Sequence, residues 1–94
     1  MNERPPVPLD HRIRRRILRR LHIRGACTSS ELSTNLKLEL TKISYHAQVL
    51  GEYDNVTEHR RGVDRANTRF ESKVADNPEV IALLAATEAE DEPQ

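Results

Sequence analysis

Four segments of the chain carry apolar residues at helical spacing, and the first of them covers residues 10–24. Asp10 is a suitable N-cap and Gly25 a suitable stop, so the pattern predicts a helix between them. Its apolar stripe consists of Ile13, Ile17, Leu18 and Leu21. Arg14 falls inside this stripe and Ile23 falls outside it, which indicates that the helix makes contacts on two faces.

Two further helices follow, separated by a short turn. The segment from Thr28 to Glu31 reads TSSE, the pattern of a capping box, in which a hydroxyl and a carboxylate satisfy backbone amides at a helix start. Residues 37–39 are too few for anything but a turn, and another helical pattern runs from residue 40 to residue 51 or 53. Two helices joined in this way make a helix-turn-helix.

The second of these helices has two chemically different faces. At about 100° per residue, one apolar stripe is formed by Leu40, Ile43, Ala47 and Leu50. The opposite face is formed by Thr41, Ser44, Tyr45 and Gln48. Any surface helix has a polar face, so this pattern alone fits a solvent coat as well as a surface that contacts bases.

Beyond residue 55 the period of the pattern changes to two. Residues 56–60 and 66–70 alternate and contain β-branched or aromatic side chains, so they predict a β-hairpin. The tip between them, residues 61–65, is basic, and it fits either a nucleic-acid contact or an exposed hairpin kept soluble by its charge.

A last helix is predicted from Asn77-Pro78-Glu79, because asparagine caps helices and proline suits their first turn. Its apolar members are Val80, Ile81, Leu83 and Leu84. The fold predicted from this order is mainly α with a small β-hairpin, a winged helix-turn-helix plus a C-terminal helix. We expect a flexible N-terminal arm at 1–9, the winged helix-turn-helix domain at 10–74, a C-terminal helix at 76–88 that serves dimerisation, and an acidic tail at 89–94.

Charge is segregated along the chain, although the 94 residues have a formal net charge of zero. Residues 1–24 hold eight arginines against two acidic residues, a net charge of +6, whereas residues 74–94 hold six acidic residues and no basic one, which gives −6. A polyanion would be attracted to the first segment and repelled by the second. Alternatively, the two ends neutralise each other within a chain or across a dimer.

Few other features suggest chemistry. The single cysteine, Cys27, cannot form an internal disulfide, and the chain shows no apolar run long enough to cross a bilayer, so we expect a cytoplasmic protein without membrane contact. Cys27 itself fits a small buried residue or a lone thiol sensor. The cysteine and the histidines lack a metal-ligand spacing, and no phosphate loop or nucleophile elbow is present. We therefore expect no metal, no cofactor and no enzymatic activity.

Two groups of side chains fit structural roles. His46 lies beside the apolar stripe of its helix, where one ring nitrogen can bond a backbone carbonyl while the ring packs. The far side of the first helix carries several arginines, for which a solvated face or partners in the acidic tail are expected: Arg12, Arg15, Arg16 and Arg19.

The stretch from Asp10 to Ser72 resembles the ArsR-type bacterial repressors. The resemblance is carried by RRRILRRL in the first helix, SSELSTNLKLELTKISYHAQVL across the helix-turn-helix and RRGVDRANTRFES at the wing, and KISYHAQVL is its most specific part. It implies that the DNA-binding residues are Thr41, Lys42, Ser44, Tyr45 and Gln48 toward the major groove, with Arg60, Arg61 and Arg65 near the minor groove or phosphates.

The chain departs from this family in three ways. Lys37 stands where a glycine is usual, and Glu39 stands where a capping serine or threonine is usual. Members that sense arsenic or related ions carry cysteines at positions that correspond to Thr28, Ser30 and Ser33 in this chain. The resemblance therefore implies no thiolate metal site.

Together these patterns predict sequence-specific binding of double-stranded DNA by a homodimeric winged-helix transcriptional regulator, in keeping with the resemblance a repressor. The dimer interface is predicted at Ile23, Val80, Ile81, Leu83 and Leu84. The alternative is a winged helix that contacts another protein without reading DNA, which the neutral net charge and Glu39 favour. RNA binding is disfavoured because no exposed aromatic platform is apparent. No pocket for an effector can be recognised.

Overall fold

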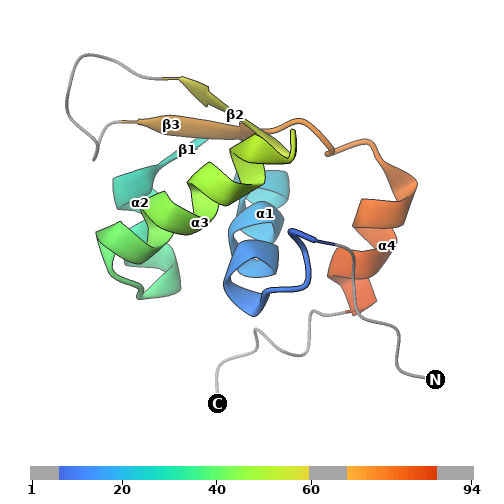
Figure 1. Ribbon diagram of the computed structural model, residues 1–94, viewed down its shortest axis with the longest axis horizontal. Helices are drawn as coiled ribbons and strands as arrows, with labels where there is room; N and C mark the ends of the chain where they lie inside the picture. The colour runs from blue at the N-terminus through green and yellow to red at the C-terminus, as the bar shows by residue number, and fades with distance from the viewer. Residues whose placement is uncertain (1–6, 60–67, 87–94) are drawn as a thin grey trace.

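The computed structural model describes residues 7–59 and 68–86. Within these residues, a small antiparallel sheet lies along one edge of a group of four helices (Figure 1). The elements follow in the order α1 (Arg12–Arg24), β1 (Cys27–Thr28), α2 (Ser29–Leu36), α3 (Leu40–Glu52), β2 (Val56–His59), β3 (Arg69–Ser72) and α4 (Pro78–Ala86). This order confirms the predicted winged helix-turn-helix with a C-terminal helix.

One hydrophobic core joins the first three helices to the sheet. Leu18 of α1, Leu32 of α2 and Ile43 of α3 are fully buried within it. Phe70 contributes from β3, and α4 closes the core from the side of α1 with Leu84. Because α3 lies across α1 and α2, its back is fixed by packing while its front faces outward.

Helix α1 begins later than predicted, because His11 rather than Asp10 is its N-cap. The His11 Nδ1 accepts a hydrogen bond from the Ile13 backbone N–H at 3.2 Å. The predicted stop at Gly25 is confirmed: this residue has φ 81°, a conformation that glycine adopts readily, and its N–H donates to the Leu21 carbonyl.

The helix-turn-helix is built from strong local signals. The Thr28 hydroxyl accepts from the Glu31 N–H at 3.1 Å, and the Glu31 carboxylate accepts from the Thr28 N–H at 2.8 Å, which confirms the capping box. Helix α2 ends at Lys37, which has the left-handed backbone (φ 56°) that glycine favours. The turn is thus made with an unfavourable residue at its most demanding position.

The sheet differs from the predicted hairpin in two respects. Its strand order is β1-β3-β2, so β3 is central and pairs with both neighbours. Strand β3 begins at Arg69 instead of residue 66, and the two-residue strand β1 was not predicted. The predicted tip, residues 61–65, lies outside the described residues, as do Arg60 and the N-terminal part of the arm.

Helix α4 begins at Pro78, two residues after the predicted boundary at residue 76, and follows the predicted Asn77 cap. The Asn77 side-chain oxygen accepts from the N–H groups of Glu79 at 2.9 Å and Val80 at 3.3 Å, which confirms the cap. The last described residue of the helix is Ala86, and residues 87–88 of the prediction lie outside the described part of the chain. None of the described helices combines the length and the apolar character needed to span a membrane.

Candidate nucleic-acid interface

The buried stripe of α3 differs by one member from the prediction. Ile43, Ala47 and Leu50 are buried as expected, but the fourth buried residue is His46 and not Leu40. Leu40 is only half-buried, and among the described residues it belongs neither to the core cluster nor to the apolar side chains packed against that cluster. Its place as a core residue was wrongly predicted.

The outward face of α3 carries the polar residues named from the sequence. Leu40 lies with four of them around a shallow surface depression, whose lining is Leu40, Thr41, Ser44, Tyr45 and Gln48. Thr41, Lys42 and Gln48 are exposed, and the Tyr45 ring is 61% exposed. Within the described part of the protein, the side chains of Thr41, Lys42, Ser44 and Gln48 make no hydrogen bonds. Their donors and acceptors are therefore open to a partner.

Aromatic contacts hold the middle of this face in place. The Tyr45 ring meets the His46 ring edge-on, with centroids 5.0 Å apart, and His46 in turn lies 4.4 Å from the His11 ring of the α1 cap. Burial, and after it the neighbouring His11 and Arg14, lower the pKa of His46 to about 4. His46 is therefore neutral at neutral pH, and it links the cap of α1 to the exposed Tyr45.

His46 is structural, as predicted from the sequence, but one detail of that prediction was not found. The Nδ1 atom of His46 is buried and has no hydrogen-bond partner among the described residues, so it does not bond a backbone carbonyl. The ring contact with His11 explains the location of the side chain. This contact could not be seen in the pattern of α3 alone, because His11 comes from another helix.

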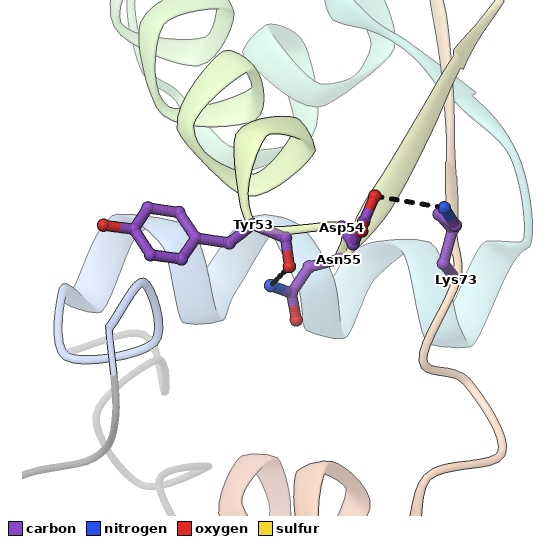
Figure 2. A network of polar contacts seen from close by, with 4 residues as sticks. All are labelled: Tyr53, Asp54, Asn55 and Lys73. Carbon is purple, nitrogen blue, oxygen red and sulfur yellow. Dashed lines mark hydrogen bonds and ion pairs between the residues drawn. The ribbon is translucent and has the colours of Figure 1, made fainter.

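The two ends of α3 are held differently. Its N-cap, Glu39, makes no side-chain cap hydrogen bond, so the first backbone N–H groups of α3 lack the usual partner. Its C-terminal end is tied to the sheet by the polar network of Figure 2. There Asp54 adopts φ 61° and bonds Lys73 (3.2 Å), while the Asn55 amide donates to the Tyr53 carbonyl (3.1 Å).

Asn55 is the buried centre of this network, with 8% of its surface exposed. Its N–H donates to the Leu50 carbonyl and its carbonyl accepts from the Lys73 N–H, so one residue joins α3 to the segment after β3. The Tyr53 ring projects away from the Asp54–Lys73 pair (Figure 2). The network thus fixes the direction in which β2 leaves α3, and with it the base of the hairpin.

Of the four arginines for which a solvated face or partners in the acidic tail were predicted, Arg12 is exposed, whereas the other three bond backbone carbonyls. The acidic tail lies outside the described residues. Arg15 is buried and donates to the Leu9 carbonyl at 2.9 Å. Arg16 donates to the Leu36 carbonyl at 3.2 Å, and Arg19 donates to the Leu84 carbonyl at 2.7 Å. These contacts join α1 to three other segments. A hydrogen bond from a side chain to a distant backbone carbonyl cannot be predicted from a sequence pattern.

The wing residues Arg60, Arg61 and Arg65 lie outside the described residues, and so does the tip that carries them. What the structure does describe is the base of the hairpin, where His59 pairs with Arg69. The His59 Nε2 lies 3.6 Å from a Glu71 carboxylate oxygen at the exposed surface.

The residues predicted for a dimer interface separate into two groups. Ile23 is 67% exposed and Ile81 is 47% exposed, and both line a surface depression between α1 and α4. Leu84 is buried within its own chain, and Val80 and Leu83 pack against the same core. A second subunit would therefore meet the two isoleucines and little of Leu84.

Neither metal nor thiol chemistry gains support from the described residues. No group of three or more histidine, cysteine, aspartate or glutamate side chains among them could hold a metal ion. Cys27 is buried, as one of its two predicted roles requires, and burial raises the pKa of its thiol. A raised pKa disfavours the reactive thiolate.

Comparisons with known proteins agree with this architecture. Residues 9–54 match a family model described as a helix-turn-helix domain. Among solved structures, the chain is similar to the YusO protein from Bacillus subtilis, with a TM-score of 0.65 and 17% sequence identity. The match covers 84% of this chain but only 58% of the YusO chain. The search of curated proteins gave no match.

Fold and sequence therefore define a protein that contains a helix-turn-helix domain within a winged-helix fold. At 17% identity the similarity to YusO shows the fold alone. Neither match singles out the ArsR-type repressors, so this finer assignment stays a prediction.

Proposed function

We propose that this protein binds double-stranded DNA in a sequence-specific manner as a dimeric transcriptional repressor. The observation that carries the proposal is the outward face of α3, whose polar side chains are open while the opposite face is buried. A helix held from behind by packing can enter the major groove without losing its orientation. The helix-turn-helix match supports the same function, and the repressor role rests on the ArsR resemblance.

The side chains of this face suit contacts to base edges. Gln48 can bond the N6 and N7 atoms of adenine as a pair, and the hydroxyls of Thr41 and Ser44 can donate or accept. Lys42 is exposed at the N-terminal end of the helix, where it can meet a phosphate or guanine. We further propose that Arg60, Arg61 and Arg65 contact the minor groove or the phosphates. The anchored base of the hairpin supports this, because it would direct the wing from a fixed point.

Dimerisation is proposed through the depression between α1 and α4. Ile23 and Ile81 expose apolar surface there, and a small domain gains by covering such surface with a second copy. A twofold dimer would place two α3 helices in successive major grooves about 34 Å apart on an inverted repeat. Sedimentation of the Ile81→Asp variant at roughly tens of micromolar should show a monomer, whereas Glu79→Lys on the same helix should sediment like the wild type. A monomeric wild type would refute the dimer.

A second function, contact with another protein, is favoured by two observations. The exposed isoleucines would suit a protein partner, and Glu39 places a negative charge at the end of α3 that would approach phosphates. The neutral net charge points the same way. In this alternative the winged helix serves as a docking module.

Selection of duplexes from a random pool, followed by titration at several salt concentrations, separates the two functions. DNA binding predicts an enriched sequence, and a loss of affinity of about 10³ or more between 50 and 200 mM salt if six or more phosphates are contacted. Failure to enrich any duplex, or to retain DNA at low salt, would reject the proposed function. A protein partner held equally well at both salt concentrations would then support the alternative.

A further inference from the structure

The depression on the outward face of α3 has a mixed chemical lining. Its aliphatic member is Leu40, which does not belong to the core, and the Tyr45 ring and the hydroxyl-bearing Thr41 and Ser44 also line it. Leu40 is half-buried between polar residues on an otherwise open face. It does not pack in the core, and an aliphatic side chain at the surface does not improve solubility. Its position suggests that it contacts an apolar group of a partner.

We propose that this depression receives the C5-methyl group of a thymine in the major groove, so that Leu40 is a specificity-determining residue. The inference rests on the proposed DNA binding and deepens it. Thymine is the one base whose major-groove edge presents a methyl group, and the neighbouring O4 is a hydrogen-bond acceptor. The depression offers the matching pair: aliphatic carbons beside hydroxyl donors.

Other bases fit this lining less well. Cytosine lacks the methyl group and presents an amino donor, while the purines present N7 with either a carbonyl or an amino group. None of them would bury apolar surface against Leu40. The contribution of the methyl group is therefore isolated by comparing thymine with a base that differs from it only by that methyl.

The position of the depression on α3 agrees with this role. It begins at Leu40, the first residue of α3, and includes the N-terminal residues that reach the base edges in helix-turn-helix proteins. Gln48 is suited to adenine at the other end of the depression. The expected half-site thus contains at least one A·T base pair at the contact, with its thymine oriented toward Leu40.

The walls of the depression are held in place. Tyr45 forms one side, and its ring rests against buried His46. Because His46 also makes a tilted ring contact with His11 of another segment, Tyr45 packs against a held neighbour, which lowers the cost of ordering the phenol on binding. A preformed recess of this kind can distinguish one methyl group, which a flexible surface could not.

The test uses the wild-type chain and a duplex obtained by selection. Each thymine is replaced in turn by deoxyuridine, which removes only the methyl group. At one position in each half-site, affinity should fall by about fourfold, the value expected for one methyl group removed from water. Leu40→Ala should bind thymine and deoxyuridine duplexes equally, whereas Val49→Ala, an aliphatic truncation on the same helix outside the depression, should keep the preference.

The outcomes separate this inference from the proposed function. If the protein binds its selected duplex but no thymine shows a methyl effect, the inference is overturned while DNA binding stands. If Leu40→Ala keeps the full preference, the methyl is read elsewhere and the inference fails. If the wild type binds no duplex, both fail together. The deoxyuridine series needs no variant, so it remains decisive even if Leu40→Ala does not fold.

Discussion

Helices α1 and α3 are both thirteen residues long, yet their polar surfaces are used in opposite ways. By composition α1 is the better candidate for nucleic-acid binding, since it holds seven arginines and α3 holds one lysine. In the fold, however, arginines of α1 donate to backbone carbonyls of other segments, whereas the side chains of α3 face outward around an open depression. Positive charge alone is therefore a poor guide to the proposed binding surface.

The physical reason lies in the ends of the neighbouring helices. The last carbonyls of a helix have no intrahelical partner and carry partial negative charge, so a guanidinium is a suitable donor for them. Leu36 is the last residue of α2, and Leu84 belongs to α4, whose last described residue is Ala86. By bonding these carbonyls, Arg16 and Arg19 tie the helices to α1. The arginines are thus framework residues.

The largest expected effect is a loss of stability when one of these framework contacts is removed. Arg15→Met should lower the free energy of unfolding by about 2–3 kcal/mol, because the buried Leu9 carbonyl loses a charged donor. Arg24→Met removes an exposed arginine from the same helix and should change stability by less than about 0.5 kcal/mol. Urea unfolding measures both. Equal losses for the two variants would show that α1 owes its role to charge and not to the buried contact.

The next effect concerns the packing behind α3. His46 has its pKa lowered to about 4 in the folded protein, below the ordinary value of 6.5, so the unfolded chain binds a proton first as the pH falls. The stabilisation is complete above pH 6.5 and is lost as the pH falls toward 4. We expect a loss of about 2 kcal/mol between pH 7 and pH 5.

Urea unfolding at the two pH values checks this prediction, with His46→Gln as the control that removes the titrating group. Lowered pKa values of His11 and His22 act in the same direction, so the variant should keep a smaller pH dependence. An unchanged pH dependence in the variant would assign the effect to other groups.

The smallest effect concerns the turn that precedes α3. Lys37→Gly should raise the free energy of unfolding by about 1 kcal/mol, because glycine adopts the left-handed backbone at this position without a Cβ clash. Asn35→Gly, within α2, should instead destabilise the protein. Thermal unfolding of the two variants distinguishes them, and a destabilising Lys37→Gly would argue against the observed turn.

Local chemistry in the sequence was enough to place most element boundaries. The Thr28–Glu31 capping box, the Gly25 stop and the Asn77 cap depend on neighbouring residues, and all three occur as predicted. Strand β1 could not be predicted, because two residues show no period and their pairing with β3 is remote in sequence.

The candidate site was predicted less completely for the same reason. The polar members of α3 were named correctly as an outward face, but the helical period put Leu40 in the core and left His46 on the flank. The burial of His46 goes with a tilted ring contact to His11, which comes from a different segment. Contacts between segments, such as those of the α1 arginines, determine which side chains stay exposed. The hydrophobic periodicity of a single helix cannot predict such contacts.

The central claim, that the outward face of α3 reads DNA, is tested most directly by one ratio. This ratio compares the dissociation constants for the selected duplex and for a scrambled duplex at the same salt concentration. In the Gln48→Ala variant it should fall by about tenfold or more, the loss of one bidentate base contact, while Thr34→Ala on α2 leaves it unchanged. A Gln48→Ala protein that is folded and keeps the full ratio would contradict the account.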